Sequence, residues 1–143
     1  MKKLLTISAV VFLMIFTAGL STAKKTTAPL FPFTGVGDLF SISDTGTPGA
    51  VTSATINITE VDGLFYGTIV YGSTTINFSA VHDVTGAYSL NGVTGDGSAV
   101  QGGFVISLQK EPGISHKVNA ASIEFGILGG ADIGWSFAGV LFQ

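Results

Sequence analysis

The sequence predicts an all-β fold, an antiparallel meander of about eight strands that closes into a small β-barrel. Two observations carry this prediction. After residue 35, apolar and polar side chains alternate through most of the chain, which is the spacing of half-buried strands, and no long stretch has helical spacing. Turn-forming dipeptides separate the alternating segments at short intervals. Consecutive strands therefore pair as neighbours, and closure removes the exposed edges of the sheet.

The first 23 residues have the layout of a cleavable secretory signal peptide. Lys2 and Lys3 form a positive start, residues 4–16 are mostly apolar, and Ser21 and Ala23 occupy the −3 and −1 positions of a small-residue cleavage site. The apolar segment is shorter than a spanning helix needs. The protein is expected to be exported to the periplasm or the extracellular space, in a bacterium as the short Lys-Lys start indicates. An uncleaved membrane anchor is the alternative.

Residues 24–35 contain Pro29 and Pro32, which lack the backbone donor that a ladder uses, so they are expected to form an extended leader. A single β-barrel domain is expected over residues 36–143. A chain of this size can build one hydrophobic core without disulfides.

Each expected strand is marked by its own alternation or by the turns beside it. Ile56 and Ile58 alternate with threonine and asparagine in the second strand, and Ile76 and Phe78 do so in the fourth. Six dipeptides tolerate the positive φ of tight turns: Asp62-Gly63, Gly72-Ser73, Asn91-Gly92, Asp96-Gly97, Pro112-Gly113 and Gly129-Gly130. The strands are expected, in order, over residues 36–43, 51–60, 64–71, 74–82, 86–93, 98–109, 117–127 and 131–142.

Glycines inside these strands support closure of the sheet. Glycine weakens a flat strand but allows the sharp bending that a small barrel needs. The glycines concerned are Gly67, Gly102, Gly103, Gly126, Gly134 and Gly139. A two-sheet sandwich is the alternative, and it would require longer crossing connections than the sequence offers.

One face of the strands is apolar and the other is rich in Thr, Ser, Asn, Gly and Ala. In a soluble barrel the apolar face points inward, whereas in an outer-membrane barrel it points at lipid. The three tyrosines and single tryptophan are too few for the aromatic girdles of a membrane barrel, which favours the soluble form. The apolar face is expected to comprise Phe40, Ile42, Ile56, Ile58, Phe65, Ile69, Ile76, Phe78, Tyr88, Leu90, Phe104, Ile106, Leu108, Ile123, Phe125, Ile127, Ile133, Trp135, Phe137 and Leu141.

The composition excludes several function classes. Among 143 residues there is no cysteine, which rules out disulfides, iron–sulfur clusters, Cys-ligated zinc and a cysteine nucleophile. The six basic residues are all lysine and the net charge is −3, so no nucleic-acid partner is expected. No phosphate-binding glycine loop or dinucleotide fingerprint is present, and no cofactor is expected.

Catalysis and metal binding are also not expected. His82 and His116 are the only histidines, and no Gly-x-Ser-x-Gly elbow accompanies them. Neither histidine has the paired spacing of a zinc site, and the single carboxylate of Asp96 is too little for calcium. The protein is predicted not to be an enzyme. A hydrolase or isomerase that uses His82 or His116 is the minor alternative.

The segment from Ile58 to Thr68, with its Asp-Gly-x-Phe-x-Gly-Thr run, resembles a hairpin of small exported meander barrels of the calycin group, the avidin-like and lipocalin-like proteins. Tyr88–Gly92 and Gly134-Trp135 are similar in character. The resemblance covers about four strands, and it implies a barrel fold with small-ligand binding as a tendency of the group. The Gly-x-Trp near the start of lipocalins and the tryptophan ring of avidin are absent, so biotin-type binding is not implied.

The sequence thus predicts a non-enzymatic exported barrel that binds a small apolar ligand or a partner protein. Trp135, Tyr88 and Phe104 are the candidate ligand-binding residues because they are aromatic. An outer-membrane barrel with a structural or pore-like role is the alternative. Large apolar residues on the polar face indicate either a slipped register or bulge, or a surface for a partner or a second copy: Leu64, Tyr66, Val70, Val105, Val140 and Phe142. Whether the interior is filled or hollow stays open.

Overall fold

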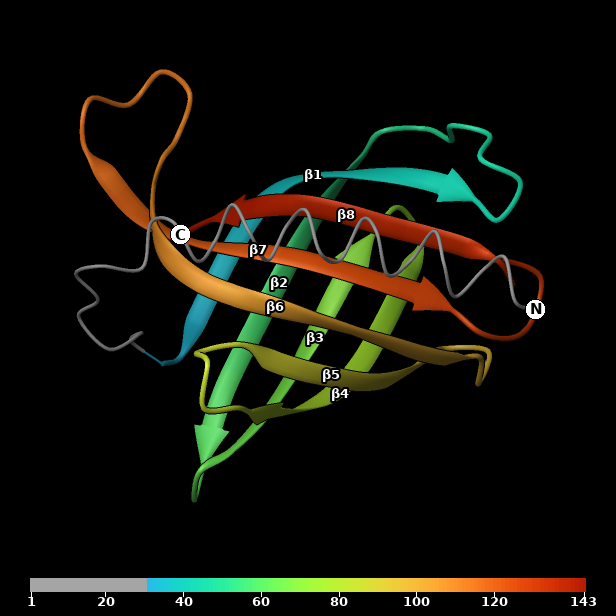
Figure 1. The fold of residues 1–143 in the computed structure, drawn as a ribbon, viewed down its shortest axis with the longest axis horizontal. Helices are drawn as coiled ribbons and strands as arrows, with labels where there is room; N and C mark the ends of the chain where they lie inside the picture. The colour runs from blue at the N-terminus through green and yellow to red at the C-terminus, as the bar shows by residue number, and fades with distance from the viewer. Residues whose placement is uncertain (1–30) are drawn as a thin grey trace.

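The structure, a computed structural model, describes residues 31–143. Eight antiparallel strands follow one another in sequence order around a closed barrel (Figure 1). The first and last strands close it, with Val36 opposite Phe142 and Ser43 opposite Trp135. The strands are β1 (Phe33–Ser43), β2 (Thr52–Val61), β3 (Leu64–Tyr71), β4 (Thr74–His82), β5 (Tyr88–Thr94), β6 (Ala99–Lys110), β7 (Lys117–Ile127) and β8 (Trp135–Phe142).

The predicted fold class is confirmed, and the strands lie within four residues of their expected ends. The largest difference is at β8, which begins at Trp135 because residues 128–134 form a turn with positive φ at Gly130 and Gly134. Strand β1 begins at Phe33, inside the expected leader, because the Phe33 side chain is buried in the core. The expected signal peptide lies outside the described residues. No helix in residues 31–143 is long and apolar enough to cross a membrane.

The tight turns use most of the dipeptides that the sequence marks. Asp62 and Gly63 both have positive φ, 53° and 77°, as the two-residue turn of a twisted hairpin requires. The exception is Asn91-Gly92, which lies inside β5 rather than in a turn. A Cβ on Gly92 would lie 2.7 Å from the Asn77 carbonyl oxygen. Glycine is therefore needed there for close approach of the strands.

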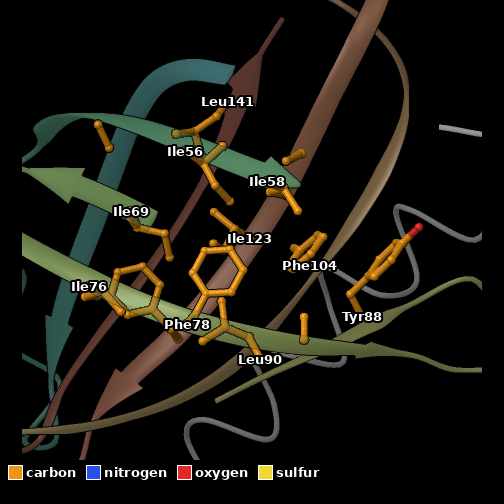
Figure 2. Close-up of a cluster of buried hydrophobic side chains, with 14 of the residues drawn as sticks. Ile56, Ile58, Ile69, Ile76, Phe78, Tyr88, Leu90, Phe104, Ile123 and Leu141 are labelled. Atoms are coloured by element: carbon orange, nitrogen blue, oxygen red, sulfur yellow. The ribbon is translucent and has the colours of Figure 1, made fainter. Parts of the chain in front are cut away.

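The barrel interior is filled by side chains. Every strand contributes to one hydrophobic cluster, and Figure 2 shows isoleucine, leucine and phenylalanine side chains from several strands meeting around the axis. The largest fully buried side chains are Phe33, Phe104, Phe125, Leu39, Ile56, Ile58, Ile69, Ile76, Leu90, Ile123, Ile127 and Leu141. The interior of the barrel is thus a packed core rather than a ligand cavity.

Several residues of the expected apolar face do not belong to the buried core. Phe40 points outward and is 62% exposed, because β1 directs Phe33 and Leu39 inward and Phe40 takes the opposite parity. Ile42 shares that outward parity, and Ile133 is exposed in the turn before β8. Leu108 is exposed near the end of β6. The alternation in β1 is ambiguous in the sequence since its inward positions between Phe33 and Leu39 are glycines.

Candidate functional site

The three aromatic residues proposed as a ligand site do not lie together. Tyr88 and Phe104 are core residues on neighbouring strands, and their buried rings pack against each other. Trp135 begins β8 at the other end of the barrel, beside the 44–51 loop. The three side chains therefore do not line one opening.

Tyr88 belongs to an aromatic cluster that closes one end of the barrel. Its ring centroid is 4.9 Å from that of Phe65 and 4.6 Å from that of His82, and Phe31 packs 5.0 Å from Phe65. Burial, with a smaller effect of Glu60, raises the pKa of the Tyr88 phenol above its ordinary value. The Tyr88 hydroxyl is directed away from the core cluster in Figure 2. These four aromatic side chains form an aromatic plug at this end of the barrel, with a polar group on its outer side.

The expected interaction patch is divided between two walls of the barrel. Leu64, Tyr66 and Val70 are exposed on β3. Val140 and Phe142 are half-buried on β8, and Val105 is half-buried on β6. The second group lies on the two strands beside β7, and β7 is four strands from β3 in the closed order. The two groups are therefore on opposite sides of the barrel. All six side chains follow the outward parity of their strands, which excludes a slipped register.

The wall that contains Val140 and Phe142 carries a depression. This outer groove has a volume of about 910 Å³ and is bounded by the outward side of β1 and β8 and by the loop between β6 and β7. Phe40 stands at its edge as the most exposed aromatic side chain of the wall. The residues that line it are Val36, Gly37, Asp38, Phe40, Leu108, Gln109, Lys110, Glu111, Pro112, Lys117, Ser122, Ala138, Gly139, Val140 and Phe142.

A second depression shares Phe40 and Ala138 with the outer groove. This Glu124 pocket has a volume of about 390 Å³, which falls in the range of small-molecule sites. Its lining residues are Phe40, Ser41, Ile42, Pro48, Gly49, Val51, Glu124, Ser136, Phe137 and Ala138. The lining is thus mostly apolar, and Glu124 is the one ionisable group among these described residues.

The strand register explains how Glu124 reaches this pocket. Ile123 and Phe125 point into the core, so Glu124 between them points outward from β7. Its direct neighbours across the ladders are Gly103 on β6 and Ala138 on β8, which have little or no side chain. The carboxylate is therefore flanked by backbone and methyl surface rather than by polar partners.

The Glu124 carboxylate is buried without a partner. The residue is only 3% exposed, and neither carboxylate oxygen has a hydrogen bond. Burial raises the pKa of this carboxyl from 4.5 to about 7 because the charged form loses its hydration. A buried carboxylate without donors is unfavourable, and such a perturbed group in a cleft is a candidate for function.

Sequence reasoning did not single out Glu124 as a site residue. The available signal was a lone acidic side chain in the middle of a strand whose other outward positions are small, such as Ala120 and Ser122. That pattern does not show what lies opposite in the ladder. The neighbours Gly103 and Ala138 become visible only with the register.

Neither histidine forms a catalytic constellation with a serine in the described residues. His82 ends β4 and is exposed, whereas His116 lies in the loop between β6 and β7. The hydrogen bonds of the described side chains include none that joins either histidine to Ser79, Ser115 or a carboxylate. In the part of the chain that the structure describes, no three His, Asp or Glu residues lie together as a metal site.

Comparison with known proteins adds no relative: no protein family matches the chain, and no curated protein or solved structure is significantly similar to it. The closed eight-stranded meander is compatible with a calycin-like barrel. The site must therefore be interpreted from its own geometry.

Proposed function

We propose that this protein is an exported, non-enzymatic β-barrel that binds a small, largely apolar ligand in the Glu124 pocket on its outer wall. The observation that carries the proposal is the combination of an apolar lining with a single buried, unpartnered carboxylate. Binding sites for small molecules have this composition, mostly apolar with a few polar groups that fix orientation. Because the core is packed, the ligand binds outside the barrel rather than along its axis.

Fluorescence of the single tryptophan offers a direct test. Trp135 lies against Gly49, which lines the pocket, since a Cβ on Gly49 would lie 2.7 Å from Trp135 Cζ3. We expect n-octanol to cause a saturable change in Trp135 fluorescence. The Ala138→Leu variant should lose this response because the larger side chain fills the pocket. The matched control, Ser79→Leu on the exposed side of β4, should respond like the native protein. Absence of saturable binding, or equal binding by Ala138→Leu, would contradict the proposal.

A partner protein or a second copy of the chain at the outer groove is the second candidate. Phe40 and Val36 are exposed at this groove, and burial of such side chains stabilises association. The groove also carries Asp38 on β1 and Lys110, Glu111 and Lys117 near the β6–β7 loop, so charges of both signs line it. Light scattering at high protein concentration tests self-association, and Phe40→Ser should reduce it.

The distribution of polarity favours a soluble barrel over a membrane barrel. A transmembrane barrel presents an apolar band to lipid and a polar lumen. Here the interior is the apolar core, and the outward positions of β2 and β4 include Asn57, Thr59, Asn77 and Ser79, all exposed.

A further inference from the structure

We propose that the ligand of the Glu124 pocket is an apolar amine, whose ammonium group binds the Glu124 carboxylate while its hydrocarbon part packs on the apolar lining. This inference rests on the proposed function and identifies the chemical class of the ligand. It begins from the two carboxylate oxygens of Glu124, which are both buried and both lack a donor.

Within residues 31–143, the structure places no cation beside this carboxylate. None of the described residues that line the pocket is a lysine, an arginine or a histidine. Lys110 and Lys117 line the outer groove instead. A buried carboxylate without a counter-charge retains much of its desolvation penalty, and a ligand that brings a positive charge offsets it.

An ammonium group can also donate to both of the free carboxylate oxygens. It carries three donors, and a carboxylate accepts at both oxygens. The hydroxyls of Ser41 and Ser136 also line the pocket, and Ser41 Oγ donates to the Ala50 carbonyl oxygen at 3.1 Å. The two Glu124 oxygens are the charged acceptors among the described lining residues, so they are the acceptors that an ammonium group prefers.

The rest of the pocket requires an apolar body. Phe40, Ile42 and Val51 line one side, and Phe137 and Ala138 line the other. A hydrocarbon chain or ring removes this surface from water, and the free energy of this burial favours binding. A small hydrophilic amine lacks this contribution. The combination selects an amine with an apolar tail over ammonium ion or a polar amine.

The test compares three probes of equal chain length with the purified protein at pH 8: n-octylamine, n-octanol and n-octanoate. Binding is followed by Trp135 fluorescence and by calorimetry. We expect n-octylamine to bind more tightly than n-octanol by about tenfold or more, because a hydrogen bond between charged groups contributes more binding free energy than one from a neutral hydroxyl. The carboxylate n-octanoate should bind most weakly because it places like charges together.

Glu124→Gln removes the charge and keeps the shape, so it should abolish the preference for the amine over n-octanol. Glu60→Gln, an exposed acid on β2, is the matched control and should keep the preference. Equal binding of amine and alcohol to the native protein, or a preference that persists in folded Glu124→Gln, would overturn the amine assignment and leave the proposed function standing. Failure of all three probes to bind would instead reject the proposed function. The comparison of probes on the native protein decides the matter even if Glu124→Gln does not fold.

Discussion

The rings of Tyr88 and Phe104 stack with their centroids 4.6 Å apart and their planes only 3° from parallel. The two residues are directly opposite each other on β5 and β6, so the register of the sheet places the rings together. Phe104 also meets Phe78 edge-on at 6.0 Å. This stack connects the aromatic plug at the end of the barrel to the core beneath it, as Figure 2 shows for Tyr88 and Phe104.

Truncation of Phe104 should therefore destabilise the protein strongly. Phe104 is 1% exposed, and loss of a buried phenylalanine side chain leaves a cavity. We expect Phe104→Ala to lower the free energy of unfolding by about 3–5 kcal/mol. Denaturant unfolding followed by circular dichroism measures this. Phe40→Ala is the control because Phe40 points outward, and its effect should stay within about 0.5 kcal/mol. Equal effects of the two substitutions would contradict the assigned faces of β1 and β6.

Glycines on the inward side of the strands should be intolerant of a methyl group. A Cβ on Gly102 would lie 2.1 Å from the backbone oxygen of Glu124, where no atom fits. Gly102→Ala is expected to cost about 1–3 kcal/mol or more, since backbone must shift to accept it. Gly126→Ala is the matched control because its Cβ would lie 3.7 Å from the nearest atom, Ser136 Oγ. A smaller loss for Gly102→Ala than for Gly126→Ala in thermal unfolding would show that the strands do not approach so closely.

The sequence predicts the strands because both of their signals are local. Alternation of Ile76 and Phe78 and the Asp62-Gly63 turn depend on residues adjacent in the chain. The pocket depends on residues that are distant in the chain, since Phe40, Glu124 and Ala138 come from β1, β7 and β8. Only the register of the closed sheet brings them together, and the sequence does not specify that register.

The sequence also does not show which of the three proposed aromatic site residues lie near an opening of the barrel. Aromatic character alone cannot separate a core residue such as Phe104 from one at an opening. Inward parity can be read from the alternation, but the depth along the barrel axis depends on strand tilt. Tyr88 and Trp135 are both on apolar-patterned strands, and the structure places them at opposite ends.

The stability of the protein should depend on the ionisation of Glu124. The folded chain holds the pKa of this carboxyl at about 7, whereas its ordinary value is 4.5, so between these values the folded state binds a proton that the unfolded state releases. The free energy of unfolding should therefore fall as pH rises from about 4.5 to 7, by at most about 3 kcal/mol, and this contribution should be constant above that range.

Glu124→Gln should lack this decline, so the native protein and the variant are compared by denaturant unfolding at several pH values. Hydrogen bonds in their turns lower the pKa of the Asp83 and Asp96 carboxyls. Ionisation of these two groups therefore makes the free energy of unfolding rise with pH, in a lower pH range than that of Glu124. The difference between the two curves removes their contribution, since both proteins contain them. Parallel curves would indicate that Glu124 titrates normally in the folded protein.

The location of the protein in the cell should follow from its outward side chains. Asn57, Asn77 and Asn91 are exposed on β2, β4 and β5, and such residues are unfavourable against lipid. We expect the protein to be released with soluble periplasmic markers by osmotic shock, and its intact mass to correspond to a chain that begins at Lys24. Recovery in the outer-membrane fraction as a band whose mobility changes on heating would favour the membrane barrel. A mass that includes residues 1–23 would instead contradict the predicted cleavage after Ala23.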